Sequence, residues 1–121
     1  MNGLHHIALI VSDVSFLRFY ECLGFSVKSR TPRPEHHDDF VMMEGNGLTL
    51  EIFVDGTHPP RVTGPEALGL RHFALRTTDI EADIAALAAA GYPSEAIRTA
   101  PDGKRFVFVK DPDGLPVELH E

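Results

Sequence analysis

The chain has 121 residues, a formal net charge of −7 and a hydrophobic content of 43%. This length fits one globular domain, and the acidic balance argues against binding to nucleic acid or to an anionic membrane surface, since either needs a basic patch. No apolar run approaches the length of a membrane span, and the N-terminal residues lack the features of a signal peptide. The single cysteine, Cys22, excludes an internal disulfide, so we expect a cytoplasmic protein.

The first half of the chain predicts one strand, one helix and three further strands. Residues 4–11 are apolar and form a short run, which is typical of a strand. Asp13 is placed to cap a helix that ends at Gly24. The later strands are expected at 25–29, 40–43 and 48–54, with Asn46 and Gly47 as the hairpin turn between the last two. The polar segment 31–39 is predicted to be a mobile loop.

The second half predicts the same order of elements. Residues 70–76 form a strand, Asp79 caps a helix, and Gly91 ends that helix. The remaining strands are expected at 96–99, 106–109 and 115–120, with the Pro-Asp-Gly turn at 112–114 before the last of them. Each half is therefore a βαβββ module. We place the first module at 1–56, a linker rich in Pro and Gly at 57–68 and the second module at 69–121, all within one domain.

The two halves also repeat particular residues. LHHIALIVSD (4–13) matches LRHFALRTTD (70–79), and GLTLEI (47–52) matches GLPVEL (114–119). His6 therefore recurs as His72, and Glu51 recurs as Glu118. A duplicated fold explains repeated apolar residues and glycines, but it does not explain two repeated polar pairs inside apolar strands.

The repeated pairs have the composition of a metal site. Side chains alternate across a strand, so His6 is expected to share a face with Ala8, and His5 is expected to point to the other face. Two imidazoles and two carboxylates suit a divalent ion such as Zn, Ni, Co, Mn or Fe, and a metal would satisfy both carboxylates. The alternative is that the histidines are hydrogen-bonded in the core and the glutamates lie at exposed strand edges.

Several motifs resemble those of a known superfamily. HHIAL, FYECLGF, LTLEIF, GLRHFAL and FVKDPDGLPVEL, arranged as a duplicated βαβββ unit, resemble the vicinal oxygen chelate superfamily. Its members include glyoxalase I, extradiol dioxygenases and the fosfomycin- and bleomycin-resistance proteins. The resemblance implies an α+β fold in which two tandem modules form a curved eight-stranded mixed sheet around a cleft. It also implies a homodimer, with sites formed within one chain or across two.

Among these members the chain is most similar to glyoxalase I. Carried over to this sequence, the resemblance implies one divalent metal, with Zn or Ni favoured, and these ligands: His6, Glu51, His72 and Glu118. It implies a lyase or isomerase that chelates adjacent oxygens of a small substrate and stabilises an enediolate-type intermediate, with Glu118 or Glu51 as the catalytic base. Two positions depart from glyoxalase I, Ile10 in place of an arginine that binds glutathione and Asp55 in place of an asparagine. A substrate other than a glutathione adduct is therefore an equal expectation.

Three other functions fit the same superfamily. An Fe(II)-dependent extradiol-type dioxygenase or a thiol transferase would use two histidines and one carboxylate, so a ligand at Glu51 separates them from glyoxalase-like chemistry. A non-catalytic drug-binding resistance protein would generally lack the ligand set, which is complete here. We therefore rank the metal-dependent lyase or isomerase first.

Overall fold

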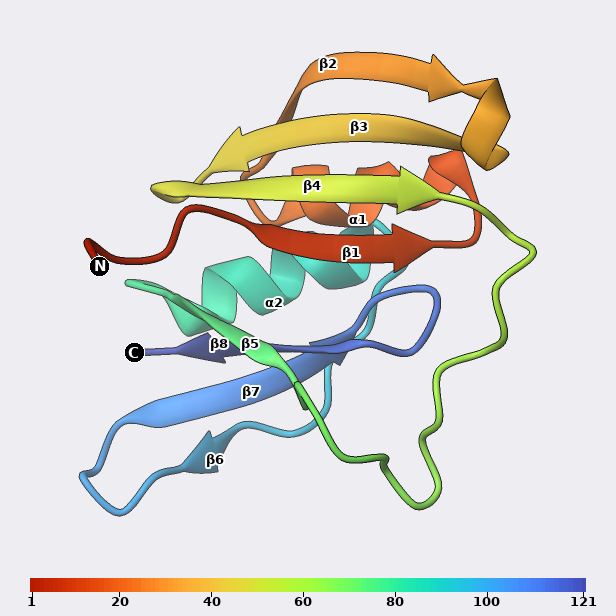
Figure 1. Cartoon of the computed structure of the whole chain (residues 1–121). Helices are drawn as coiled ribbons and strands as arrows, with labels where there is room; N and C mark the ends of the chain where they lie inside the picture. The colour runs from red at the N-terminus through yellow and green to blue at the C-terminus, as the bar shows by residue number, and fades with distance from the viewer. The chain divides into compact units, whose positions relative to one another are not determined.

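The chain folds as two βαβββ modules, as predicted from the repeat. A computed structural model describes all 121 residues, which divide into two compact units, Met1–Pro59 and Pro60–Glu121. The eight strands form two four-stranded sheets, one in each unit (Figure 1). The α+β class with two tandem modules is thus confirmed, whereas one continuous eight-stranded sheet is not shown. Neither helix is long and apolar enough to cross a membrane.

The first unit contains a mixed sheet and one short helix. Its elements are β1 (Ile7–Val11), η1 (Val14–Phe16), α1 (Leu17–Cys22), β2 (Ser26–Arg33), η2 (Pro34–His36), β3 (Asp38–Gly45) and β4 (Leu48–Val54). The strand order is β1-β4-β3-β2, with β1 parallel to β4 and the other pairs antiparallel. The edge strand β1 therefore lies beside β4, the strand that carries Glu51.

Local sequence signals explain the turns of this unit. The Asp13 carboxylate accepts a hydrogen bond from the Ser15 backbone N–H at 2.7 Å, which starts the helical segment. Asn46 and Gly47 both have positive φ, 55° and 70°, as a two-residue hairpin turn requires. Gly45 has no room for a side chain, because a Cβ there would lie 2.2 Å from the carbonyl oxygen of Gly24.

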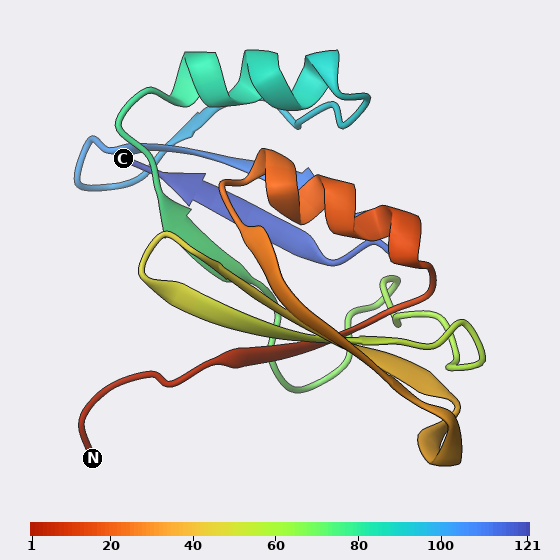
Figure 2. The ribbon, with the colours of Figure 1, turned by 90° about the horizontal axis from the view of Figure 1, so that it is seen from above.

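The second unit repeats this arrangement. Its elements are β5 (Phe73–Arg76), α2 (Ile80–Ala89), β6 (Arg98–Thr99), β7 (Arg105–Lys110) and β8 (Pro116–His120). The strand order is β5-β8-β7-β6, with β5 parallel to β8. Asp79 caps α2 by accepting from the Ala82 backbone N–H at 3.0 Å, and α2 runs along one face of the sheet (Figure 2).

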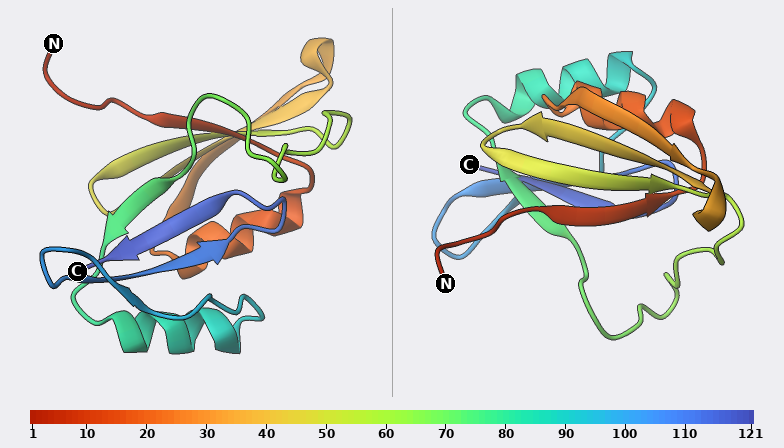
Figure 3. Two further views of the ribbon diagram at one scale, coloured as in Figure 1. Left: turned by 90° about the horizontal axis from the view of Figure 1, so that it is seen from below. Right: turned by 45° about the horizontal axis from the view of Figure 1, so that its top comes forward.

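Two predictions of local structure were wrong. The first strand of each module begins three residues later than expected, at Ile7 and Phe73, and the segment before β1 extends away from its strand (Figure 3). His6 and His72 therefore precede their strands. The expected loop at 31–39 is mostly strand, because Arg33 donates to both carboxylate oxygens of Asp38, at 2.7 and 2.6 Å, and this pair extends the β2–β3 ladder.

Each sheet has one apolar face and one face that carries a glutamate. The apolar face of the first sheet includes the fully buried Leu50 and Ile52, and that of the second includes Val107 and Val117. We call the opposite faces the glutamate faces. They include Ala8, Ile10, Phe40, Met42, Glu44, Thr49, Glu51 and Phe53 in the first unit, and Ala74, Arg76, Phe106, Phe108, Lys110, Pro116, Glu118 and His120 in the second.

Candidate functional site

The strand register places the two repeated glutamates identically in the two modules. Ala8 pairs with Glu51 across the parallel strands β1 and β4, and Ala74 pairs with Glu118 across β5 and β8. Each histidine lies two residues before the alanine in the sequence, immediately ahead of the strand. The duplication has therefore preserved two things: the spacing of histidine and alanine along the chain, and the pairing of that alanine with the glutamate.

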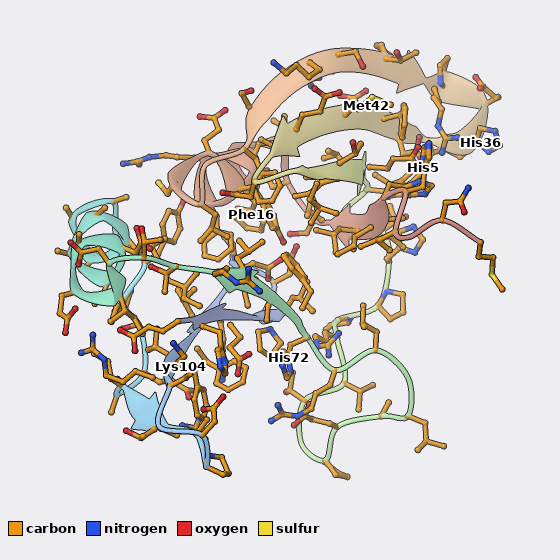
Figure 4. All side chains as sticks on the ribbon, turned by 90° about the vertical axis from the view of Figure 1, so that its left-hand side faces the viewer. His5, Phe16, His36, Met42, His72 and Lys104 are labelled. Atoms are coloured by element: carbon orange, nitrogen blue, oxygen red, sulfur yellow. The ribbon has the colours of Figure 1, made fainter.

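In the first module this relation brings the two side chains together. The His6 Nε2 atom lies 3.1 Å from Glu51 Oε2, and both side chains are partly exposed, at 36% and 23%. The His5 and His6 rings meet edge to face, with their Nδ1 atoms 2.9 Å apart, and His5 is labelled in Figure 4. The expectation that His5 points away from His6 was wrong, because both residues precede β1 and strand alternation does not apply to them. His5 holds Nδ1 of His6 and leaves Nε2 directed at the carboxylate.

In the second module each member of the pair has a further partner. Glu118 Oε2 lies 3.4 Å from Nδ1 of His120, its neighbour on the glutamate face. His72, labelled in Figure 4, packs edge to face against Phe108 with ring centres 4.9 Å apart. Arg71 Nη1 lies 3.2 Å from His72 Nδ1, and a guanidinium can only donate, so Nδ1 accepts. A neutral His72 ring in this contact carries its proton on Nε2.

The first-module pair matches the spacing of two ligands on one ion. Ligand atoms about 2.1 Å from a metal lie roughly 3.0–3.4 Å apart at octahedral or tetrahedral angles, and His6 Nε2 is 3.1 Å from Glu51 Oε2. A ligand role for His72 through Nε2 requires the Arg71 N–H to turn away from Nδ1. Neither module alone gathers three or more His, Cys, Asp or Glu side chains fit to hold a metal. Each module thus offers one imidazole and one carboxylate.

Aromatic rings surround both carboxylates. Phe40 and Phe53 lie beside Glu51 with ring centres 5.2 Å apart. In the second module Phe106 stacks on His120 at 5.8 Å with an interplanar angle of 11°. By the repeat, His120 occupies the position of Phe53, so an aromatic pair beside the glutamate is common to the modules and only the second has an imidazole there.

Asp55, one of the two departures from glyoxalase I, has a local structural role. Its carboxylate accepts from the Thr57 backbone N–H at 2.9 Å and from the Thr57 hydroxyl at 2.7 Å, and these hydrogen bonds lower the pKa of Asp55. The carboxylate also lies 3.5 Å from His58 Nε2. Asp55 therefore orders the turn after β4.

The sequence alone offers Arg71 as a surface charge first and as a binder of an anionic substrate group second, gives no role to Arg98, and leaves His120 either beside the site or exposed at the C-terminus. The alternation of β8 was the one signal for His120, since it places this residue on the face of Glu118. The arginines gave no such signal, because Arg71 precedes β5 and Arg98 lies in a strand of two residues.

Comparisons with known proteins identify relatives along the whole chain. The model of the Glyoxalase/Bleomycin resistance protein/Dioxygenase superfamily matches residues 3–119. The uncharacterized protein YaeR of Escherichia coli (strain K12) is 40% identical, and the match covers 100% of this chain and 97% of YaeR. The uncharacterized protein YwkD of Bacillus subtilis (strain 168) is 41% identical, with coverage of 100% and 98%. The crystal structure of a glyoxalase family protein from Enterococcus faecalis matches with a TM-score of 0.92 at 40% identity, covering 100% of this chain and 98% of that one.

Proposed function

Because the chain belongs to the glyoxalase/bleomycin resistance protein/dioxygenase superfamily, we propose that it is a metal-dependent, glyoxalase I-like lyase or isomerase. The observation that carries this proposal is the distance of 3.1 Å between His6 and Glu51, and it is supported by the recurrence of the same two sequence positions at His72 and Glu118. We further propose that the protein acts as a cytoplasmic homodimer on a small molecule, with its half-sites completed within one chain or across two.

Members of this superfamily typically bind a divalent metal. We assign four ligands to one such ion: His6, Glu51, His72 and Glu118. The donor set of two imidazoles and two carboxylates suits Zn or Ni first, and also Co, Mn or Fe. When bound, the ion supplies a Lewis acid to two adjacent substrate oxygens and stabilises an enediolate-type anion.

The chain supplies the groups that move the proton. Glu118 and Glu51 are the candidate bases, because each has a carboxylate on a glutamate face beside aromatic rings. Glu118 has the further advantage of His120, whose Nδ1 is 3.4 Å away and whose side chain is 34% exposed. In this proposal a Glu118 oxygen takes a proton from one substrate carbon and returns a proton to the adjacent carbon, and His120 can exchange the proton held on that carboxylate with solvent.

The aromatic rings have a second role in the proposal. Phe108 lies opposite Glu118 with Phe106 two residues before it, and Phe53 follows Glu51 on the same face with Phe40 opposite Phe53. Apolar rings exclude water from a charged intermediate and strengthen the electrostatic interactions that stabilise it.

The contact between His6 and Glu51 favours this function over the alternatives. A dioxygenase or thiol transferase of the superfamily would need two histidines and one carboxylate. Here the first-module carboxylate already lies at ligand spacing from its histidine, which supports a fourth ligand at Glu51.

The test is turnover of adducts between methylglyoxal and small thiols, including glutathione, followed by proton NMR. We expect metal-loaded wild type to convert at least one adduct, and Glu118→Gln to lose activity by about 100-fold, the effect of removing a general base. Phe16→Leu, which changes a half-buried side chain on η1, serves as the control. Metal-loaded wild type that converts no adduct would contradict the lyase or isomerase assignment.

A further inference from the structure

Two guanidinium groups lie over one phenylalanine ring beside Glu118. Phe108 is the register partner of Glu118 and is 7% exposed. The guanidinium carbons of Arg71 and Arg98 lie 5.6 and 5.3 Å from the centre of the Phe108 ring, and Arg98 lies 5.6 Å from that of Phe106. Such cation–π contacts hold a guanidinium in place without using its N–H groups. We call Arg71, Arg98, Phe106 and Phe108 the arginine platform.

Both arginines retain donors for a ligand. A guanidinium has five N–H donors, and Arg98 uses Nη2 for one hydrogen bond, to Glu95 at 2.9 Å. Arg71 donates from Nε to Glu66 at 3.2 Å and from Nη1 to His72. The two glutamates are well exposed, and exposed ion pairs of this kind contribute little, so a ligand anion can replace them.

The first module does not offer an equivalent site. Arg33 also lies over a phenylalanine, with its guanidinium carbon 4.9 Å from the Phe53 ring centre. However, Arg33 donates to both carboxylate oxygens of Asp38, whose side chain is only 10% exposed, and this hydrogen-bonded pair lowers the pKa of Asp38. The charge of Arg33 is therefore neutralised by a partner that a ligand would not displace.

The rest of the second glutamate face adds positive charge. Arg76 and Lys110 are exposed on this face, where the repeat places Ile10 at the position of Arg76 in the first module. Four cationic side chains, Arg71, Arg76, Arg98 and Lys110, thus lie near three carboxylates, those of Glu66, Glu95 and Glu118, in a chain of net charge −7. Such a field attracts a small anion.

We propose that the arginine platform binds the carboxylate or phosphate group of the substrate, so that the substrate is an anion with a separate pair of adjacent oxygens. Arg71 and Arg98 donate to the anionic group, and the planar guanidinium edges match the two oxygens that such a group presents. The anion site stands on the platform alone. Its link to the adjacent oxygens rests on the proposed function, which places those oxygens beside Glu118.

The first experiment tests the anion site without metal. Inorganic phosphate is titrated into protein stripped with a chelator, and binding is followed by phosphorus NMR line width. Arg98→Met and Arg71→Met keep an unbranched apolar stem over Phe108 and remove the charge. We expect each to weaken phosphate binding about tenfold, as for the loss of a charge-assisted hydrogen bond. Arg18→Met on α1 makes the same charge change at an exposed position and is expected to have little effect.

The second experiment tests the substrate class on metal-loaded protein. Dihydroxyacetone and dihydroxyacetone phosphate share the adjacent oxygens and differ in the phosphate. We expect the phosphate ester to bind wild type at least about tenfold more tightly, and Arg98→Met to remove this preference.

The outcomes separate the inference from the proposed function. Equal phosphate affinity in wild type, Arg98→Met and Arg71→Met would overturn the anion site, even if metal binding and turnover persist. Phosphate binding that depends on both arginines, in a protein that holds no metal, would support the anion site and overturn the metal-dependent function.

Discussion

The two modules share a backbone arrangement and differ in what surrounds it. In both, a parallel strand pair sets an alanine opposite the glutamate, and the histidine lies two residues earlier. In the first module the nearest ionisable partner of the glutamate is His6, at 3.1 Å. In the second it is His120, at 3.4 Å, while His72 is held by Arg71 and Phe108.

This difference shows what a duplication conserves. Backbone register fixes where the repeated residues lie, because each register position determines a side-chain face. The neighbours of those residues are free to diverge. In the first module Arg33, which lies over Phe53, is paired with the half-buried Asp38. In the second module Arg71 and Arg98 lie over Phe108 beside the glutamate, and His120 contacts the glutamate. We infer that the first module contributes mainly metal ligands and that the second also contributes proton transfer and substrate binding.

The largest effect is expected for equivalent core residues of the two modules. Ile52 and Leu119 correspond in the repeat and are both buried, at 0% and 4% exposure. Ile52→Ala and Leu119→Ala should each lower the free energy of unfolding by about 2–5 kcal/mol, measured by urea titration. Ile10→Ala, at a position 53% exposed, serves as the control. A loss of less than about 1 kcal/mol for only one of the core variants would show that the modules do not depend equally on their cores.

The next effect concerns the two carboxylates. Glu51→Gln and Glu118→Gln should each weaken metal binding by about 100-fold or more, because each removes a charged ligand and second-shell changes alone cost 10–100-fold. Affinity is measured by competition with a chromogenic chelator. Glu44→Gln, an exposed residue opposite Thr49 in the first sheet, should leave the affinity unchanged. If only one of Glu51→Gln and Glu118→Gln loses metal affinity, the two modules do not contribute equivalent ligands.

A smaller effect is expected for the residue that orients a ligand. His5→Ala should weaken metal binding about tenfold, because His5 holds Nδ1 of His6 and so directs Nε2 toward Glu51. The same chelator competition measures the metal affinity of His5→Ala, with His36→Ala on η2 as the control. Unchanged affinity in His5→Ala would mean that His6 keeps its orientation without this neighbour.

The smallest effect is a pH-dependent change in stability. Arg105 pairs with Glu81 and with Glu121 in the second module, and these contacts lower the pKa of both carboxyls below the ordinary 4.5. A lowered folded pKa contributes stability that is present above the ordinary pKa and is lost as the pH falls through the folded value. Arg105→Met should therefore destabilise the protein slightly at pH 7.

The difference in unfolding temperature between Arg105→Met and wild type should become smaller as the pH falls below the lowered pKa values. Thermal unfolding from pH 7 to pH 3 measures this difference. Arg33→Met removes the corresponding partner of Asp38 in the first module and should show the same direction of change. A difference in unfolding temperature that stays constant over this range, in either variant, would contradict an electrostatic origin of its loss of stability.

Much of the fold was predictable because its signals are local. The caps at Asp13 and Asp79 and the hairpin at Asn46 and Gly47 each depend on a few adjacent residues. Strand extent is not local. The segment 31–39 has a polar, loop-like composition, yet the cross-strand pair of Arg33 and Asp38 makes most of it strand.

The residues of the candidate site were proposed from period and register. The repeat singles out His6, Glu51, His72 and Glu118, and alternation puts His120 on the face of Glu118; a shared metal at the four repeated residues stays a prediction. The arginine platform could not be predicted from the sequence, because Arg71 precedes β5 and Arg98 begins β6, and only the fold brings both to Phe108. The contact of His5 with His6 was not predicted, because the alternation of side chains applies only inside a strand and both residues precede β1.

The most direct test of the account is the metal content of purified, tag-free protein, measured by elemental analysis for wild type, His6→Ala and His72→Ala. If each module contributes ligands to one ion, wild type holds about one divalent metal per chain, and both variants lose most of it while keeping their fold by circular dichroism. Full metal retention in either variant, or wild type that cannot be loaded with Zn, Ni, Co, Mn or Fe, would contradict the central claim.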